Sequence, residues 1–161
     1  MLERRKTPPV SISDIDLDVL EDTLSFYIRT VNIAVSRDLD ERLEGRDVAK
    51  GTGKITTLLM VDSHPGIRPS VIAQLILKDR SAMGRLVEQM ENHGLLTRET
   101  SAEDNRAQEL YITEKGAQLA AQVRAIVSLQ SKDFFDFIPQ DEQRLLMDIL
   151  RRAYRRIAGL S

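Results

Sequence analysis

Between Ile67 and Gly116, the spacing at which apolar residues repeat changes from that of helices to that of strands. Two short stretches first repeat apolar residues at steps of three and four, which is typical of helices with one buried face. Two strand-like runs, Leu95–Arg98 and Glu109–Ile112, then flank a polar segment, as in a β-hairpin. Helix, turn, helix and hairpin in this order predict a winged helix-turn-helix, a module that mostly binds duplex DNA.

The second of these helices carries a complete set of local signals. Asp79 is a favoured N-cap residue, and Gly94 is placed to end the helix in the left-handed conformation. The helix before it is expected to begin at Pro69, whose missing N–H would be unpaired there anyway, and Leu77-Lys78 is expected to form the turn. The positions predicted to be buried share the spacing i, i+3, i+4 and i+7, and they are Met83, Leu86, Val87 and Met90.

Long helical patterns flank this module on both sides. One runs from about Asp14 to Gly45 and another starts at Asp141, and each carries apolar residues on more than one side. A small domain cannot cover that much apolar surface, so we expect a contact between subunits. The residues assigned to this contact are Leu17, Leu20, Leu24, Leu146, Ile149, Leu150, Ala153 and Ile157.

The predicted fold class is mainly α with a small β-hairpin wing, a winged helix-turn-helix between N- and C-terminal dimerisation helices. The chain of 161 residues is long enough for one compact subunit. Residues 1–13 are polar and are expected to form a flexible N-terminal arm. Residues 14–45 and 114–161 are assigned to the helical dimerisation region, and residues 46–113 to the DNA-binding region.

The charge balance argues against a broadly basic DNA-binding protein. The formal net charge is −2, and the stretch from Arg68 to Lys115 holds seven Lys or Arg residues against eight Asp or Glu residues. DNA binding needs a local basic surface and not a basic total, so the prediction depends on where the cations point. Arg68 and Lys78 are expected to hold phosphates.

Arg80, Ser81 and Arg85 fall opposite the buried face, near the start of the second helix. Either guanidinium can reach a guanine edge or a phosphate, and the Ser81 hydroxyl can serve either. Gly84 has no side chain and would permit close approach to a groove wall. The alternative is that Arg80 and Arg85 are solvated or pair with Glu88.

Arg106 lies at the predicted tip of the hairpin, with Asn105 beside it. Arg106 is placed to enter a neighbouring minor groove, where a narrow width concentrates negative potential. Asn105 is included in the predicted DNA-binding set. The alternative for Arg106 is an intramolecular ion pair with Asp104 or Glu103.

The composition gives little support to several other classes of site. Cysteine is absent, which excludes disulfides, a thiol redox switch and cysteine-containing metal sites, and two histidines offer no metal or catalytic cluster. We therefore expect that the protein binds no cofactor and is not an enzyme. The KGTGK run at residues 50–54 lacks the first Gly and the Ser or Thr of a phosphate-binding Walker motif. No apolar run approaches the ~20 residues of a membrane span and no secretory signal is present, so we expect a cytoplasmic protein without a membrane partner.

These residues also carry a family resemblance. RPSVIAQLI before the turn, DRSAMGRLVEQMENHGLLTR through the second helix, and the wing pattern Asp104-x-Arg106 followed by YITEKG resemble the MarR family of bacterial transcriptional regulators. With the long first helix and two C-terminal helices, the resemblance covers about residues 14–160.

The resemblance implies a homodimer, joined by the first and the last two helices, that binds a pseudo-palindromic operator in double-stranded DNA. It implies a wing contact for Arg106 and a wing-bracing role for Asp104. Two positions depart from the family pattern. Arg68 stands where many members have a capping Thr or Ser before the Pro, so either the start of that helix is weaker or Arg68 is turned toward DNA. Gly84 stands where a hydroxyl often contacts DNA, so base readout is expected to be sparser.

Such families often lodge a small aromatic acid between the dimer helices and the reading head. Tyr27, Arg29 and His64 are the residues that could line such a cleft by position, and the alternative places Tyr27 in the core and the other two on the surface. We therefore predict a sequence-specific DNA-binding repressor released by a small molecule, with half-sites about one helical turn apart. The alternative is a winged-helix module that binds another protein and no DNA, which the acidic total would suit.

Overall fold

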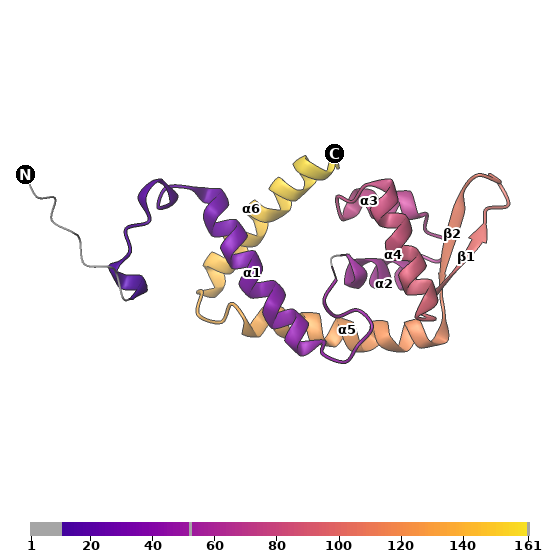
Figure 1. The fold of residues 1–161 in the computed structure, drawn as a ribbon, viewed down its shortest axis with the longest axis horizontal. Helices are drawn as coiled ribbons and strands as arrows, with labels where there is room; N and C mark the ends of the chain where they lie inside the picture. Colours follow the sequence, from indigo (N-terminus) through magenta and orange to yellow (C-terminus); the bar gives the residue numbers. More distant parts are fainter. Residues whose placement is uncertain (1–10, 52, 161) are drawn as a thin grey trace, which may run out of the picture. The chain divides into compact units, whose positions relative to one another are not determined.

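The computed structural model of the chain describes residues 11–51 and 53–160. Two compact units make up the chain, Met1–Ser36 and Arg37–Ser161, and helix α1 (Leu24–Arg42) contains the boundary between them. The elements after α1 are α2 (Lys54–Ser63), α3 (Pro69–Leu75), α4 (Arg80–Asn92), β1 (Leu96–Thr100), β2 (Gln108–Ile112), α5 (Glu114–Asp133) and α6 (Gln140–Ala158) (Figure 1). The predicted fold class, mainly α with a small hairpin wing, is confirmed.

The long N-terminal helix starts later than predicted. It begins at Leu24 and not at about Asp14. The 3-10 turns that precede it are η1 (Ile12–Asp14) and η2 (Asp18–Leu20). Leu17 and Leu20, both assigned to the subunit contact, therefore lie before the helix. Residues 1–10 of the predicted arm lie outside the described residues.

Aspartate side chains explain the late start of α1. The Asp14 carboxylate accepts a hydrogen bond from the backbone N–H of Ser11 at 3.1 Å, and the Asp16 carboxylate accepts one from the N–H of Asp18 at 2.9 Å. Asp18 itself is in the left-handed region, with φ of 53°. Short polar side chains that bond nearby N–H groups compete with helical hydrogen bonds, so this stretch forms turns.

The core of the second unit lies between the helices and the hairpin. Helix α2 packs against α5, α3 packs against α4, and α4 also contacts β1. The predicted buried face of α4 is confirmed. The largest fully buried side chains are Leu43, Leu58, Ile72, Met83, Met90, Leu95, Leu96 and Leu110. This packing fixes the orientation of α4 about its own axis.

The hairpin is antiparallel and longer than predicted. Its register runs from Leu96 opposite Ile112 to Thr100 opposite Gln108. The first strand continues past Arg98, and its residues after Leu96 are exposed, so the cross-strand ladder holds them rather than burial. Ile67, just before α3, forms an isolated bridge with Leu110, which ties the helix-turn-helix to the wing.

The two C-terminal helices start close to where the sequence places them. Thr113 caps α5, with its Oγ1 accepting a hydrogen bond from the Gly116 N–H at 3.0 Å. Helix α6 begins one residue before the predicted Asp141. None of the helices in residues 11–51 and 53–160 combines the length and apolar character needed to cross a bilayer.

The end of α6 is bonded to α3. The Tyr154 hydroxyl donates a hydrogen bond to the Leu75 carbonyl at 2.8 Å, and the Gln74 side-chain amide donates one to the Ala158 carbonyl at 3.2 Å. Both bonds reach backbone carbonyls at helix ends, which have no partner within their own helix. The last turn of α6 is therefore attached to the first helix of the helix-turn-helix.

Candidate nucleic-acid interface

Helix α4 has one face in the core and the other in solvent. The Asp79 carboxylate caps the helix as predicted, accepting a hydrogen bond from the Ala82 N–H at 2.7 Å, and Met83 on the inner face is only 2% exposed. The exposed residues of the first turns are the predicted Arg80, Ser81, Gly84 and Arg85. A helix anchored in this way offers its N-terminal donors in fixed positions.

Gly84 is not required by the packing of α4. A Cβ atom built at this position meets nothing within 4 Å, and the backbone there is ordinary helix. Glycine in a helix interior is unfavourable relative to alanine, because it loses more conformational freedom on folding. The absence of a side chain at Gly84 therefore matters only for what approaches the exposed face.

The two arginines of α4 are free of ion pairs within residues 11–51 and 53–160. Glu88, their predicted alternative partner, adds its negative charge to that of Glu91 near Arg98. Arg98 Nη2 lies 2.7 Å from Glu91 Oε1, and this hydrogen bond raises the pKa of Arg98 and lowers the pKa of Glu91. Arg80 and Arg85 thus keep their donors for an external acceptor.

The tip of the wing is a tight turn built on Asp104. Its carboxylate accepts a hydrogen bond from the backbone N–H of Arg106 at 3.0 Å, and its carbonyl accepts one from the N–H of Ala107 at 2.9 Å. Asn105 and Arg106 are exposed. No ion pair joins the Arg106 guanidinium to Asp104 or Glu103, so the turn presents that side chain outward.

Arg68 lies at the base of the wing, in a cluster that the sequence did not reveal. The Tyr111 hydroxyl donates a hydrogen bond to Glu109 at 2.9 Å. That bond, a further one from Ser101 and the positive charge of Arg68 lower the pKa of Glu109. Arg68 is the N-cap residue of α3 but makes no side-chain cap bond, as expected for a residue that replaces Thr or Ser. The alternation of Glu109 and Tyr111 on one strand face was the available signal.

The three residues suggested for a ligand pocket are each bonded locally. The Tyr27 hydroxyl donates to the Glu21 carbonyl at 3.0 Å, and Arg29 Nε donates to the Ser25 carbonyl at 3.2 Å. His64 Nδ1 lies 2.8 Å from the Ser63 hydroxyl. Tyr27 and Arg29 belong to the unit Met1–Ser36, and His64 belongs to the unit Arg37–Ser161.

The residues assigned to the subunit contact are largely exposed. Leu150, near the middle of α6, is 49% exposed, and Leu24 at the start of α1 is 74% exposed. The other exposed members of the set are Leu20, Leu146, Ile149, Ala153 and Ile157, while Leu17 is half-buried. Together, Leu146, Ile149, Leu150, Ala153 and Ile157 form an apolar stripe along α6.

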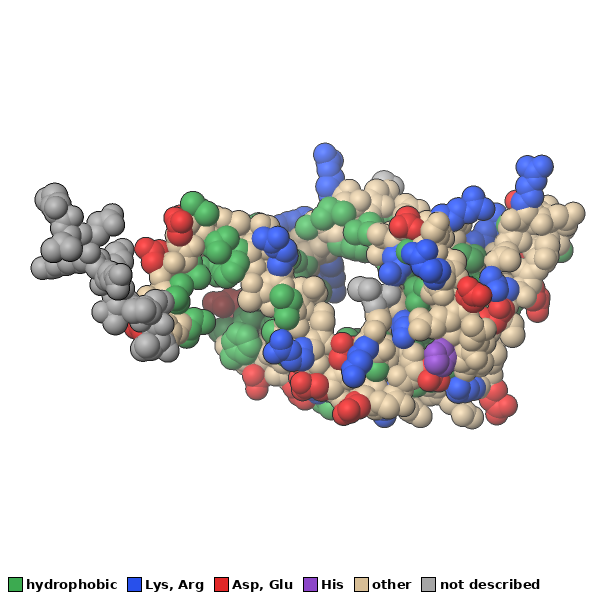
Figure 2. All heavy atoms as spheres, viewed as in Figure 1, with side chains coloured by type: hydrophobic (Ala, Val, Ile, Leu, Met, Phe, Trp, Pro, Cys, Tyr) green, Lys and Arg blue, Asp and Glu red, His purple; other side chains and the backbone are tan. Residues whose placement is uncertain are grey.

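Charged side chains of both signs lie around α4 and the hairpin. Figure 2 shows Lys and Arg side chains interspersed with Asp and Glu rather than one continuous basic patch. This arrangement fits the nearly neutral charge of the central stretch. Any polyanion would therefore be held at separate cationic points and not by a uniform field.

Known proteins resemble the chain in sequence. Residues 51–107 match the sequence model of the MarR family. A candidate transcriptional regulatory protein for the hcr operon of Thauera aromatica is 30% identical over 132 residues, which cover 82% of this chain and 79% of that protein. The transcriptional regulator HosA of Escherichia coli is 26% identical over 92 residues, covering 57% of this chain and 68% of HosA.

Solved structures resemble the chain in fold. The transcriptional repressor CouR bound to a 23-mer DNA duplex has a TM-score of 0.79 at 22% identity, over 88% of this chain and 99% of CouR. A candidate MarR-family regulator from Listeria monocytogenes in complex with 26-mer DNA has a TM-score of 0.75 at 20% identity, over 85% and 90%. CouR from Rhodococcus jostii RHA1 bound to p-coumaroyl-CoA has a TM-score of 0.71 at 21% identity, over 88% and 95%.

Proposed function

Because this chain belongs to the MarR family, we propose that it is a transcriptional regulator that binds specific sequences of double-stranded DNA as a homodimer. Residues 46–113 form its DNA-binding region, and residues 14–45 and 114–161 form its dimerisation region. It acts in the cytoplasm as a repressor on a pseudo-palindromic operator. Each protomer reads one half-site, and the half-sites lie about one helical turn apart.

The observation that carries this proposal is the division of α4 into two faces. A recognition helix must be immobile on one side and must offer unpaired donors on the other. The inner face is buried around Met83, and Arg80 and Arg85 on the outer face are exposed without ion pairs among the described residues. In our proposal Arg85 and Arg80 contact bases or phosphates, Ser81 adds a hydroxyl, and Gly84 allows the groove wall to approach.

The remaining predicted contacts surround α4 in the proposed complex. Arg68 and Lys78 hold phosphates, while Arg106 and Asn105 at the wing tip reach the neighbouring minor groove. Asp104 keeps the tip in its turn conformation through the bond to the N–H of Arg106. The exposed apolar stripe of α6 is covered by the second protomer.

Release of the operator by a small molecule is the last part of the proposal. The structural neighbour CouR is a repressor and is also known with p-coumaroyl-CoA bound, which supports a ligand with an aromatic acyl group. In our proposal the ligand binds one conformation of the dimer more tightly than the other, and the two conformations differ in the spacing of the two DNA-binding regions. Ligand binding then shifts the equilibrium toward the conformation whose spacing does not fit the operator.

The test begins with a random duplex library from which the protein selects its preferred sequence. Arg85→Ala should then weaken binding to that sequence by roughly 1–3 kcal/mol for each half-site, and should relax the preference at one base position. Arg144→Ala, which removes an exposed guanidinium from α6, is the matched control and should bind like the native protein. Fluorescence anisotropy measures both affinities.

Two outcomes would overturn parts of this proposal. Equal binding by the Arg85→Ala and Arg144→Ala variants would show that α4 is not the reading helix. A protein that enriches no sequence, and whose residual DNA binding does not weaken as salt rises, would be the alternative winged-helix module that binds another protein.

A further inference from the structure

Each of the two glycines in the KGTGK run at residues 50–54 lies against a lysine side chain, Gly51 against Lys54 and Gly53 against Lys78. A Cβ atom at Gly51 would lie 2.6 Å from Cε and 2.7 Å from Cδ of Lys54, so the Lys54 stem lies directly over Gly51. At Gly53, where φ is +87°, a Cβ atom would lie 3.1 Å from Cε of Lys78. Glycine at both positions therefore lets lysine stems lie against the backbone, which restricts where the amines can point.

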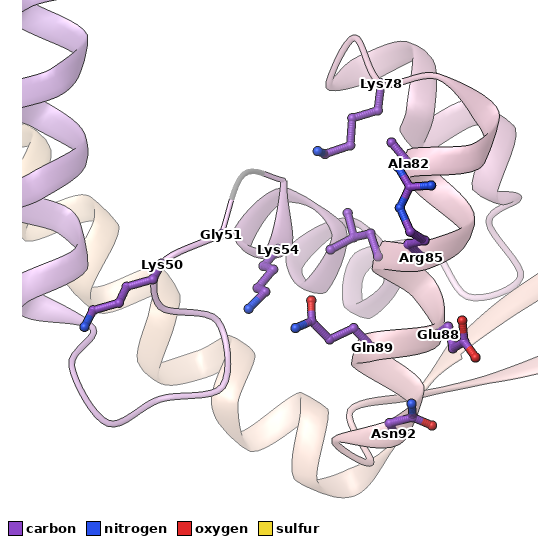
Figure 3. Close-up of a pocket in the computed structure, with 10 residues that line it drawn as sticks. Lys50, Gly51, Lys54, Lys78, Ala82, Arg85, Glu88, Gln89 and Asn92 are labelled. Atoms are coloured by element: carbon purple, nitrogen blue, oxygen red, sulfur yellow. The ribbon is translucent and has the colours of Figure 1, made fainter.

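Lys54 and Lys78 line an open hollow of about 500 Å³ beside α4. Arg85 and Gln89, one turn apart on α4, line the same hollow. Figure 3 shows Lys78 extending from the turn before α4 toward the start of α2 and Lys54 extending from the start of α2 itself, whereas Lys50 points away from both. We refer to Lys54, Lys78, Arg85 and Gln89 together as the lysine groove.

The lysine groove concentrates positive charge that the described residues do not neutralise. Elsewhere in the same unit, Lys115 lies 3.1 Å from Asp47 and Arg124 lies 2.6 Å from Asp62. The three cations of the lysine groove form no such pair within residues 11–51 and 53–160, and Glu88 is the one acidic residue among those lining the hollow. Opposite charges attract, so an anion in this hollow would be bound favourably.

We propose that the lysine groove binds phosphate groups of the DNA backbone on the α2 side of the recognition helix, with Lys54 and Lys78 as the phosphate ligands. This inference rests on the proposed DNA-binding function and adds to it the residue Lys54 and the side of α4 along which one strand runs. A helix in the major groove has a phosphate backbone on each side, so a second track of cations beside α4 is what such a complex requires.

The chemistry of the groove suits phosphate better than base edges. Lysine is a compact point charge on a flexible stem that binds phosphate without a fixed geometry, whereas arginine suits two-point recognition. The hollow also shares Arg85 with the exposed face of α4, so a strand that passes through it stays next to the reading residues. Helix α2 begins at Lys54 without a side-chain cap, and its positive end adds to the same field.

The experiment compares Lys54→Gln with Lys132→Gln, an exposed lysine at the end of α5 that makes the same change of charge. Binding to the selected duplex is measured between about 50 and 200 mM salt. A lost phosphate contact in each protomer should reduce the slope of log K against log salt by about 2 in magnitude, since each contact contributes about 0.9. Lys132→Gln should leave the slope unchanged.

Gly51→Ala tests the seat of the lysine without changing any charge. Its Cβ would displace the Lys54 stem, and Gly51 does not have a positive φ, so the backbone tolerates alanine. The affinity for the selected duplex and the magnitude of the salt slope should both decrease, as in Lys54→Gln. The double variant, Gly51→Ala with Lys54→Gln, should bind no more weakly than Lys54→Gln alone. Thermal unfolding of each variant verifies that the fold is retained.

The source of the phosphate is separated by titrating the DNA-free protein with inorganic pyrophosphate at constant ionic strength, followed by calorimetry. Reduced salt slopes without pyrophosphate binding support the backbone assignment. Tight pyrophosphate binding that Lys54→Gln abolishes, with an unchanged salt slope, would overturn it in favour of a small phosphorylated ligand. If Lys54→Gln matches Lys132→Gln while Arg85→Ala is impaired, the lysine groove is not a DNA contact and the proposed function stands. If the native protein selects no duplex, the proposed function fails first.

Discussion

Helices α4 and α6 are both amphipathic, but α4 leaves only its polar face uncovered, whereas α6 leaves its apolar face uncovered as well. In α4 the apolar side is buried in the core of its own chain, and the exposed side carries Arg80 and Arg85. In α6 the apolar stripe is exposed, and Leu150 in its middle is 49% exposed. The face that a chain leaves uncovered indicates the chemistry of its partner. A polyanion suits the first helix, and a second apolar surface suits the other.

The difference also separates two kinds of stability. Burial of Met83 and its neighbours on α4 contributes to folding of the single chain. Burial of the α6 stripe can contribute only when a second protomer covers it, so that stabilisation depends on protein concentration. Substitutions in the two helices should therefore fail in different experiments.

The largest effect is expected for Leu150→Glu. Covering the α6 stripe would bury two carboxylates without partners, at a cost of about 5 kcal/mol or more per dimer. Analytical ultracentrifugation should find monomers at concentrations where the native protein is dimeric. Val71→Glu, at an exposed apolar position of α3, is the control and should remain dimeric. A dimeric Leu150→Glu variant would show that the stripe is not the subunit contact.

A matched pair of methionines measures the other half of the comparison. Met83→Ala on α4 should lower the free energy of unfolding by about 2–5 kcal/mol, because it leaves a cavity in the core. Met147→Ala on α6, where the side chain is 45% exposed, should cost less than about 1 kcal/mol. Urea denaturation at equal protein concentration compares them. Similar losses for the two variants would contradict the assignment of α4 as the anchored helix.

The smallest effect is expected for Gly84→Ala, and stability and DNA binding should change in opposite directions. The added methyl group has open space around it, so the helix should gain roughly 0.5–1 kcal/mol of stability. The same methyl group would stand between α4 and the groove wall and should weaken operator binding. A variant that is more stable and binds DNA with native affinity would remove Gly84 from the interface.

Gly116 is the control for Gly84, because its position has no room for a side chain. A Cβ at Gly116 would collide with the backbone carbonyl of Leu95, so Gly116→Ala should destabilise the protein instead. Opposite signs in urea denaturation for the two Gly→Ala variants would separate a glycine required by packing from one that only frees the surface.

Local signals allowed α4 to be predicted almost residue by residue. Asp79 fixed its start, its apolar spacing fixed the buried face, and Gly94, with φ of +71°, follows its end. The predicted start of α1 was wrong because the spacing of apolar residues does not show the hydrogen bond from the Asp18 N–H to the Asp16 carboxylate. Spacing cannot reveal that competition, since the same aspartates also suit a helix N-terminus.

The lysine groove could not be predicted because it is formed by tertiary packing. Lys54 starts α2 and Lys78 lies in the turn between α3 and α4, and they line one hollow only because Gly53 allows Ile76 and Lys78 to approach the start of α2. In the sequence the KGTGK run could be compared only with a phosphate-loop pattern, which it does not match. The approach of the Arg68 charge to Glu109 likewise depends on the bridge between Ile67 and Leu110.

The two hydrogen bonds between α6 and α3 give the dimer a mechanical property. Tyr154 and Gln74 attach the last turn of α6 to the helix that precedes the recognition helix. A rotation of α6 against its partner would therefore be transmitted to α3, and through the short turn at Leu77 to α4. In the proposed dimer, a shift of α6 would therefore change the distance between the two recognition helices, although α6 lies at the C-terminal end of the chain.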